Sequence, residues 1–148
     1  MKEIYYVYNN EAIASCIFLS ILNKIDTLDI ARSCLVLPFL FDDRTVSYLS
    51  KNPDIELENM IREQSRLFAS FNKRYISLLP VTINSLTLLN TSNQISIGKE
   101  IVANVILDFE NKILGNRFNR ILEVIPMFLS LIEKHSTTQL YKILKVQL

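Results

Sequence analysis

An uninterrupted apolar run, LVLPFLF, occupies residues 35–41 and stops at Asp42 and Asp43. The run is too short to cross a membrane, which needs about 20 apolar residues. Pro38 has no amide proton and disfavours helical backbone at the residue before it. We therefore expect a buried strand-like or irregular segment up to that residue, with a kinked helix as the alternative. An aspartate side chain accepts hydrogen bonds from the free amides at a helix start, so the pattern predicts that Asp42 or Asp43 caps a short helix over residues 44–51.

The pattern before this run predicts a buried helix near the N-terminus. The stretch AIASCIFLSILNKI, residues 12–25, is apolar on nearly every helical face, and such a helix is buried on more than one side. Asn9 or Asn10 is suited to cap it, with Glu11 in the first turn, where the helix dipole favours an anion. A tyrosine cluster precedes this helix, and it predicts either a half-buried strand or an interface anchor: Tyr5, Tyr6 and Tyr8.

The middle of the chain combines helical spacing with a later change of period. Residues 56–71 carry apolar side chains at three- and four-residue steps, which predicts an amphipathic helix. A second helix is expected at residues 73–79, and Pro80 occupies the favoured first position of a third at residues 81–89. Two β-rich runs flank Gly98 in QISIGKEIVANVIL, and this pattern predicts a β-hairpin.

A helix pair followed by a β-hairpin is the element order of a winged helix-turn-helix, here over about residues 56–105. Residues 81–89 would be the recognition helix and residues 95–102 the wing. Yet that helix, VTINSLTLL, has no Arg or Lys for phosphates or guanine edges. The pattern therefore favours a protein-docking platform over direct reading of DNA. The nearest basic residues are the candidates for DNA contact: Lys73, Arg74 and Lys99.

The last third of the chain is predicted to be helical again. Gly115 interrupts it, and residues 117–131 form a helix that Pro126 kinks or breaks. Ser136 is expected to cap a final helix with the sequence TTQLYKILKV. The predicted fold class is mainly α, with a winged-helix-like helix pair and β-hairpin flanked by N- and C-terminal helices.

Composition narrows the class of protein. The chain is 49% hydrophobic and 21% charged, which excludes disorder, since disordered chains are poor in hydrophobic residues and rich in charge. Polar residues interrupt every apolar stretch and no signal-peptide pattern is present, so we expect a cytoplasmic protein without a membrane segment. The length fits one domain over residues 1–148. The surplus of apolar residues beyond the needs of one core predicts contact with other proteins.

The charge balance argues against a stand-alone DNA-binding protein. Sixteen basic and fifteen acidic residues give a net charge of +1, whereas proteins that neutralise phosphates usually show a clear basic excess. A small basic patch can still exist within a balanced total. A DNA-binding winged-helix transcriptional regulator therefore stays as the alternative function.

Residues with catalytic or metal-binding potential are few. His135, the one histidine, has no Cys, Asp or Glu at ligand spacing. Cys16 and Cys34 lie among aliphatic residues, and neither shows the adjacent basic residue that activates a nucleophilic thiol. The two glycines, Gly98 and Gly115, cannot form a P-loop or a dinucleotide-binding fingerprint. The sequence predicts no enzyme, no cofactor, no metal site and no small-molecule substrate.

The order of segments resembles a known family. The chain has an apolar helix in YNNEAIASCIFLSIL, a proline-centred apolar run with a basic-Thr step in CLVLPFLFDDRTVSYL, and a Pro-x-Thr helix in LLPVTINSLTLL. A β-hairpin and a Thr-rich lead into the final helix, HSTTQLYKILKVQL, complete the pattern. Together they resemble the small middle components of ABC three-component bacterial systems, with which we group the third subunit of Lamassu-type anti-phage systems. The ending at residues 146–148 departs from that pattern, which has a glycine before the end and a proline near it.

The resemblance implies a non-catalytic adaptor subunit of an anti-phage defence complex. Such a subunit works with an SMC- or Rad50-like ABC ATPase and a separate effector, often a nuclease, and connects DNA sensing to effector control. DNA contact would then occur through the complex. The run at residues 35–41 is expected to lie in the core of the chain, with partial burial against a partner as the alternative. The residues expected to contact a partner are Pro38, Phe39, Arg44, Leu140, Tyr141 and Leu144.

Overall fold

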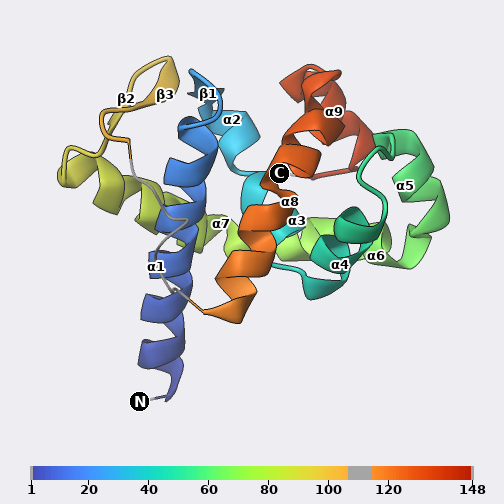
Figure 1. The fold of residues 1–148 in the computed structure, drawn as a ribbon, viewed down its shortest axis with the longest axis horizontal. Coiled ribbons are helices and arrows are strands. Elements are labelled where there is room, and N and C mark those ends of the chain that lie inside the picture. Colours follow the sequence, from blue (N-terminus) through green and yellow to red (C-terminus); the bar gives the residue numbers. More distant parts are fainter. Residues whose placement is uncertain (1, 107–114, 148) are drawn as a thin grey trace.

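The computed structural model describes residues 2–106 and 115–147, with side chains from residue 10 onward. The fold is mainly helical with a small antiparallel sheet, which confirms the predicted class. The long helices are α1 (Lys2–Leu22), α7 (Phe71–Thr91) and α8 (Asn116–Glu133). Helix α7 runs along the long axis of the molecule and packs against α1, which crosses it (Figure 1).

Shorter elements fill the space around the long helices. The β-hairpin lies at the C-terminal end of α7, and helices α5 (Leu57–Glu63) and α6 (Ser65–Ala69) lie toward its other end (Figure 1). The short helices are α2 (Ile30–Ser33), α3 (Val36–Leu40), α4 (Asp43–Lys51), α5 (Leu57–Glu63), α6 (Ser65–Ala69) and α9 (Thr137–Ile143). The strands are β1 (Leu28–Asp29), β2 (Ile95–Ile97) and β3 (Glu100–Ala103).

The apolar run at residues 35–41 forms the centre of the core. The Phe39 ring is 0% exposed and lies 5.0 Å from that of Phe71 and 5.2 Å from that of Phe128, between centroids. The expected strand-like or irregular segment is wrong, because the run forms helix α3. Pro38 is tolerated as the third helical residue, since the first three amides of a helix have no partner within it. A helix that is apolar on all sides is here buried on all sides.

Helix α1 begins earlier than its apolar pattern suggested. Its backbone is helical from Lys2, so the expected cap at Asn9 or Asn10 is wrong. The tyrosine cluster lies on this helical backbone, and the strand alternative for it is therefore wrong as well. No glycine or proline occurs in this segment, so nothing in the backbone chemistry stops the helix from extending toward the N-terminus.

Two predictions about the helices around α7 are wrong: one expected helix is divided, and two expected helices are joined into one. The single helix expected at residues 56–71 is divided at Gln64, whose φ of −118° and ψ of 47° are not helical. The two helices expected around Pro80 are one continuous helix. Pro80 is exposed, while buried residues on both sides of it hold α7 against the core, including Tyr75 and Leu86. No separate recognition helix exists at residues 81–89, so the winged-helix comparison is not confirmed.

The predicted hairpin is confirmed and belongs to a larger sheet. Strands β2 and β3 pair antiparallel, with Ile97 opposite Ile101. Strand β1 adds to the other edge of β3, with Leu28 opposite the same Ile101, so the strand order is β1-β3-β2. The sequence did not reveal β1, because two residues carry no alternating pattern. The sheet buries Leu28, Ile95 and Ile101 and joins the hairpin to the end of α1.

The C-terminal third follows the predicted order. Helix α8 continues through Pro126. Of the two predicted alternatives, a break at this proline is therefore wrong, and a kink is compatible with the structure. Ser136 caps α9 as expected, in a capping box with Gln139. The expected helical segment before Gly115 includes residues 107–114, which lie outside the described residues. No helix in the described part of the chain has the length and apolar character that a membrane span requires.

Candidate functional site

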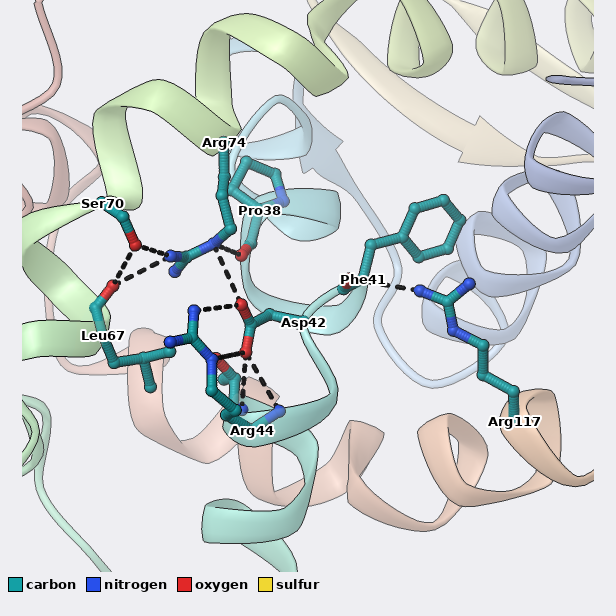
Figure 2. Close-up of polar contacts among 9 residues, drawn as sticks. Pro38, Phe41, Asp42, Arg44, Leu67, Ser70, Arg74 and Arg117 are labelled. Atoms are coloured by element: carbon teal, nitrogen blue, oxygen red, sulfur yellow. Dashed lines mark hydrogen bonds and ion pairs between the residues drawn. The ribbon is translucent and has the colours of Figure 1, made fainter. Parts of the chain in front are cut away.

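Asp42 is the centre of a polar cluster between α3 and α4 (Figure 2). It caps α4 as predicted: its Oδ1 accepts hydrogen bonds from the backbone amides of Arg44, at 3.0 Å, and Thr45, at 3.1 Å. Its Oδ2 lies 2.9 Å from Arg44 Nη2 and 3.6 Å from Arg74 Nε. One carboxylate therefore starts a helix and binds two guanidinium groups from different elements.

Arg74 connects three elements through its guanidinium group (Figure 2). Its Nε donates to the Pro38 carbonyl oxygen of α3 at 3.2 Å. Its Nη1 donates to the Leu67 carbonyl oxygen of α6 at 2.9 Å and to Ser70 Oγ at 2.6 Å. The planar guanidinium group can satisfy several carbonyl oxygens at once, which a lysine cannot do in the same geometry. Arg74 therefore holds α3, α6 and α7 together.

The cluster controls the protonation of Asp42. Burial acts to raise the pKa of the carboxyl group, but hydrogen bonds from Arg44 and the Thr45 amide, with the charge of Arg74, outweigh it and lower the pKa. Burial lowers the pKa of Arg74, and the charge of Asp42 opposes that effect. The charged form of Asp42 is therefore the form that the folded chain stabilises.

Arg117 of α8 contacts the segment between α3 and α4 and the start of α4 (Figure 2). Its Nη2 donates to the Phe41 carbonyl oxygen at 3.2 Å, and its guanidinium carbon lies 5.2 Å from the centre of the Phe41 ring. Its Nε forms an ion pair with Asp43 at 3.5 Å. Arg74 and Arg117 therefore both lie at the C-terminal half of the central apolar run, where they satisfy the free carbonyl oxygens of Pro38 and Phe41.

The three residues predicted to contact DNA do not come together. Arg74 directs its guanidinium group to the internal partners described above and is 16% exposed at the side chain. Lys73 and Lys99 are exposed, but Lys73 lies at the start of α7 and Lys99 lies in the hairpin beyond its end (Figure 1). A helix of this length extends about 30 Å, so these two lysines do not form one patch.

The residues predicted to contact a partner divide into core and surface. Four are buried and pack against other residues of the chain: Pro38, Phe39, Leu140 and Leu144. Arg44 is exposed and Tyr141 is half-buried, so these two side chains remain candidates for contact in the described fold. The sequence pattern could not separate the two groups, because residues that fill a core and residues that fill an interface are both apolar.

The candidate chemical residues form no metal-binding group. In the residues that the structure describes, no three His, Cys, Asp or Glu side chains gather in a way that could hold a metal ion. His135 Nε2 lies 2.7 Å from Glu58 Oε1 and so joins the start of α9 to α5. Cys34 is half-buried, and burial raises the pKa of its thiol, which is the opposite of the shift that activates a nucleophile.

The exposed side of α7 has no charged residue after Arg74. Residues 75–98 contain no Asp, Glu, Lys, Arg or His. Three large aliphatic side chains on this side are more than half exposed: Ile76 at 57%, Ile83 at 53% and Leu88 at 54%. We call this surface the uncharged α7 face; its other exposed residues are Ser77, Pro80, Asn84, Thr87, Asn90 and Thr91. Glu11 of α1 borders it and accepts a hydrogen bond from Asn84 at 3.0 Å.

A groove lies between α2 and α9, on another part of the surface. It has a volume of about 920 Å³, within the range of sites that bind ligands or peptide side chains. We call it the α2–α9 groove. Its lining is mostly apolar and includes Ile30, Ala31 and Cys34 on one side, Tyr75 from α7, and Tyr141 and Val146 on the other.

Comparison with known proteins shows the family. The whole chain, residues 1–148, matches the family described as ABC-three component (ABC-3C) system Middle Component 3. The chain belongs to this family. The resemblance to middle components of ABC three-component systems is therefore confirmed, whereas the narrower likeness to the Lamassu subunit stays a prediction. No curated protein and no solved structure matches the chain.

The surfaces of this Middle Component 3 chain were only partly visible in its sequence. The segment VTINSLTLL contains no Arg or Lys, which argues against direct recognition of DNA bases by this helix and also indicates the uncharged α7 face. That same absence extends over residues 75–98, and the structure adds that several aliphatic residues within it are exposed. The groove had no sequence signal, because its walls come from α2, α7 and α9, which are far apart along the chain.

Proposed function

We propose that this chain is a non-catalytic, cytoplasmic adaptor subunit of an anti-phage defence complex. In that complex it bridges an SMC- or Rad50-like ABC ATPase and an effector such as a nuclease, and it couples DNA sensing to control of the effector. Membership of the Middle Component 3 family supports association with the other subunits of such a system. The uncharged α7 face is the observation on which the proposal rests most heavily.

The composition of this face is that of an interface centre. Soluble protein surfaces are typically about 25–35% charged residues, whereas the centres of interfaces are depleted of charge and enriched in apolar side chains. The exposed residues of α7 after Arg74 include no charged side chain, and they include Ile76, Ile83 and Leu88. A partner surface that is itself apolar and uncharged could cover these residues without burying an unpaired charge, which would be unfavourable. One subunit of the complex therefore docks on α7.

The test is co-purification with the neighbouring gene products. The tagged chain is expressed with the proteins encoded beside it, and the purified product is sized. A stable complex that contains the ATPase is the expected result. A monodisperse chain that ignores its neighbours and retards duplex DNA in a gel would contradict the proposal and favour the DNA-binding regulator.

A matched pair of variants tests the docking surface. Ile83→Asp places a charge at the centre of the uncharged α7 face, and we expect it to abolish or strongly weaken recovery of a partner subunit. Ile106→Asp makes the same change at a residue that is 91% exposed and lies outside α7, and it should leave recovery unchanged. Equal recovery with both variants would show that the partner does not dock on α7.

DNA contact is proposed to belong to the complex and not to this chain alone. Lys73 and Lys99 are the exposed residues of the predicted DNA-contact set; Lys73 lies near the start of α7, and Lys99 lies in the hairpin beyond its other end (Figure 1). We expect the isolated chain not to bind DNA by itself. Reversing both charges, Lys73→Glu with Lys99→Glu, should therefore cause no measurable change in DNA binding by the isolated chain. In the assembled complex the same variant should cause at most a small loss of affinity, with a small change in salt dependence.

A further inference from the structure

The α2–α9 groove has fixed walls. The Tyr141 hydroxyl donates to the Ala31 carbonyl oxygen and lies 3.2 Å from the Tyr75 hydroxyl. The two tyrosine rings meet edge to face, with 5.8 Å between centroids. At one end of the groove, Arg32 Nε donates to Thr137 Oγ1 at 3.0 Å and so ties α2 to the start of α9. A site held by such contacts is pre-organised, so a bound ligand loses less free energy to ordering of the protein.

The charges along the groove have one sign. Lys142 and Lys145 are among its lining residues and both are exposed. No Asp or Glu is among the lining residues that the structure describes. The groove therefore combines apolar walls with a positively charged border. Behind this lining, the Asp29 carboxylate accepts a hydrogen bond from Thr137 Oγ1 at 2.6 Å and lies 3.9 Å from Arg32 Nε, so an arginine already pairs with its charge. Glu58 shares an adjoining pocket with Lys142 and is not among the residues that line the groove. A ligand with an apolar side chain and flanking negative charge complements both properties.

The backbone at Lys145 supports a role for its side chain. Lys145 has a φ of 56°, a left-handed conformation that favours glycine. It follows the C-cap of α9 in a Schellman arrangement, in which the Val146 amide donates to the Tyr141 carbonyl oxygen at 3.1 Å and the Lys145 amide to that of Lys142 at 3.2 Å. Glycine would adopt this backbone conformation with less strain than lysine. The lysine at this position places a positive charge on the border of the groove.

We propose that the α2–α9 groove binds a short segment of a partner subunit in which a large apolar side chain is flanked by aspartate or glutamate residues. The apolar side chain lies between α2 and α9 against Tyr75 and Tyr141, and the carboxylates pair with Lys142 and Lys145. This inference rests on the proposed function, because it assigns the segment to another subunit of the complex. It concerns a surface distinct from the uncharged α7 face.

The absence of tryptophan from the chain gives a direct assay. The probe is a short peptide with adjacent tryptophan and leucine residues and aspartates on both sides, titrated with the full-length chain. Since all tryptophan emission comes from the peptide, entry into the apolar groove should shift that emission to shorter wavelength in a saturable way. Binding should weaken as ionic strength rises, and a peptide with lysines in place of the aspartates should not bind.

A matched set of variants locates the bound peptide. Lys142→Glu with Lys145→Glu should weaken binding by about tenfold or more. Lys51→Glu changes an exposed lysine of α4 outside the groove and should leave the affinity unchanged. Bound peptide should also slow alkylation of Cys34, which lines the groove, but not of Cys16 in α1, as measured by mass spectrometry.

The outcomes separate this inference from the proposed function. No saturable shift, equal binding of the lysine peptide, or saturation by a simple fatty acid in place of the peptide would overturn the groove assignment. A complex that still forms through α7 would then leave the adaptor function standing. Peptide binding that depends on the two lysines, in a chain that recovers no partner on co-expression, would support the groove chemistry and contradict the adaptor function.

Discussion

Arg74 and Arg44 both bind Asp42 and yet differ in how much they contribute to stability. Arg74 is 16% exposed at its side chain and makes hydrogen bonds to α3 and α6, whereas the Arg44 side chain is 66% exposed. Removal of a buried cation leaves its partners unpaired, and an exposed ion pair adds little to stability. The same type of contact therefore has different energetic weight at the two positions.

We expect Arg74→Met to lower the free energy of unfolding by about 2–3 kcal/mol, because three internal hydrogen-bond acceptors and Asp42 lose a partner. Arg44→Met should cause a much smaller loss, which makes it the matched control. Urea unfolding at neutral pH followed by circular dichroism measures both. Equal losses would contradict the internal role assigned to Arg74.

Asp42 should make the stability of the chain depend on acid pH. The pKa of its carboxyl group is lowered in the folded chain, against an unfolded value near 3.9. The folded state therefore gains stability from the charged form, in full above the unfolded pKa, and loses it as the pH falls through the folded pKa. The difference in unfolding free energy between the wild type and Asp42→Asn should be largest near neutral pH and shrink below about pH 4. A difference that does not change with pH would show that other carboxyl groups carry the dependence.

At the scale of elements, the sequence was informative where local chemistry fixes a boundary. Asp42 or Asp43, and Ser136, were predicted as caps because an oxygen-bearing side chain before a helix satisfies its free amides; Asp42 and Ser136 are the caps that the structure shows. The hairpin around Gly98 was found because the period of the pattern changes there. Such signals lie within a few residues of the feature they specify.

Elements decided by tertiary packing were predicted less well. Pro38 and Pro80 both lie inside helices, although proline was taken to favour a strand-like or irregular segment at the first, with a kinked helix as the alternative, and to begin a new helix at the second. Burial of α3 on all sides and anchoring of α7 on both sides of Pro80 outweigh these local preferences. The groove and the internal role of Arg74 depend on contacts between distant segments, for which one sequence has no signal.

At the scale of the whole molecule, the core and the uncharged α7 face account for the apolar composition in different ways. Residues 35–40 of the apolar run are buried in the chain's own core, which removes them from water without a partner, and Phe41 at its end is half-buried against that core. Ile76, Ile83 and Leu88 remain more than half exposed in the isolated chain. An apolar surface of this kind favours self-association of the isolated chain in water. Burial of the same surface against another subunit prevents that self-association.

The isolated chain should therefore associate with itself as its concentration rises, and Ile76→Asp should reduce that association without lowering the melting temperature. The melting temperature should be unaffected because the side chain is 57% exposed and a substitution at such a site changes the free energy of unfolding by about 0.5 kcal/mol or less. Light scattering over a concentration series and thermal unfolding by circular dichroism measure the two effects. Ile121→Asp, at a residue that is 1% exposed, is the contrasting variant and should unfold the chain. If Ile76→Asp lowered the melting temperature as Ile121→Asp does, the α7 side chain would belong to the core, and the docking surface would have to lie elsewhere.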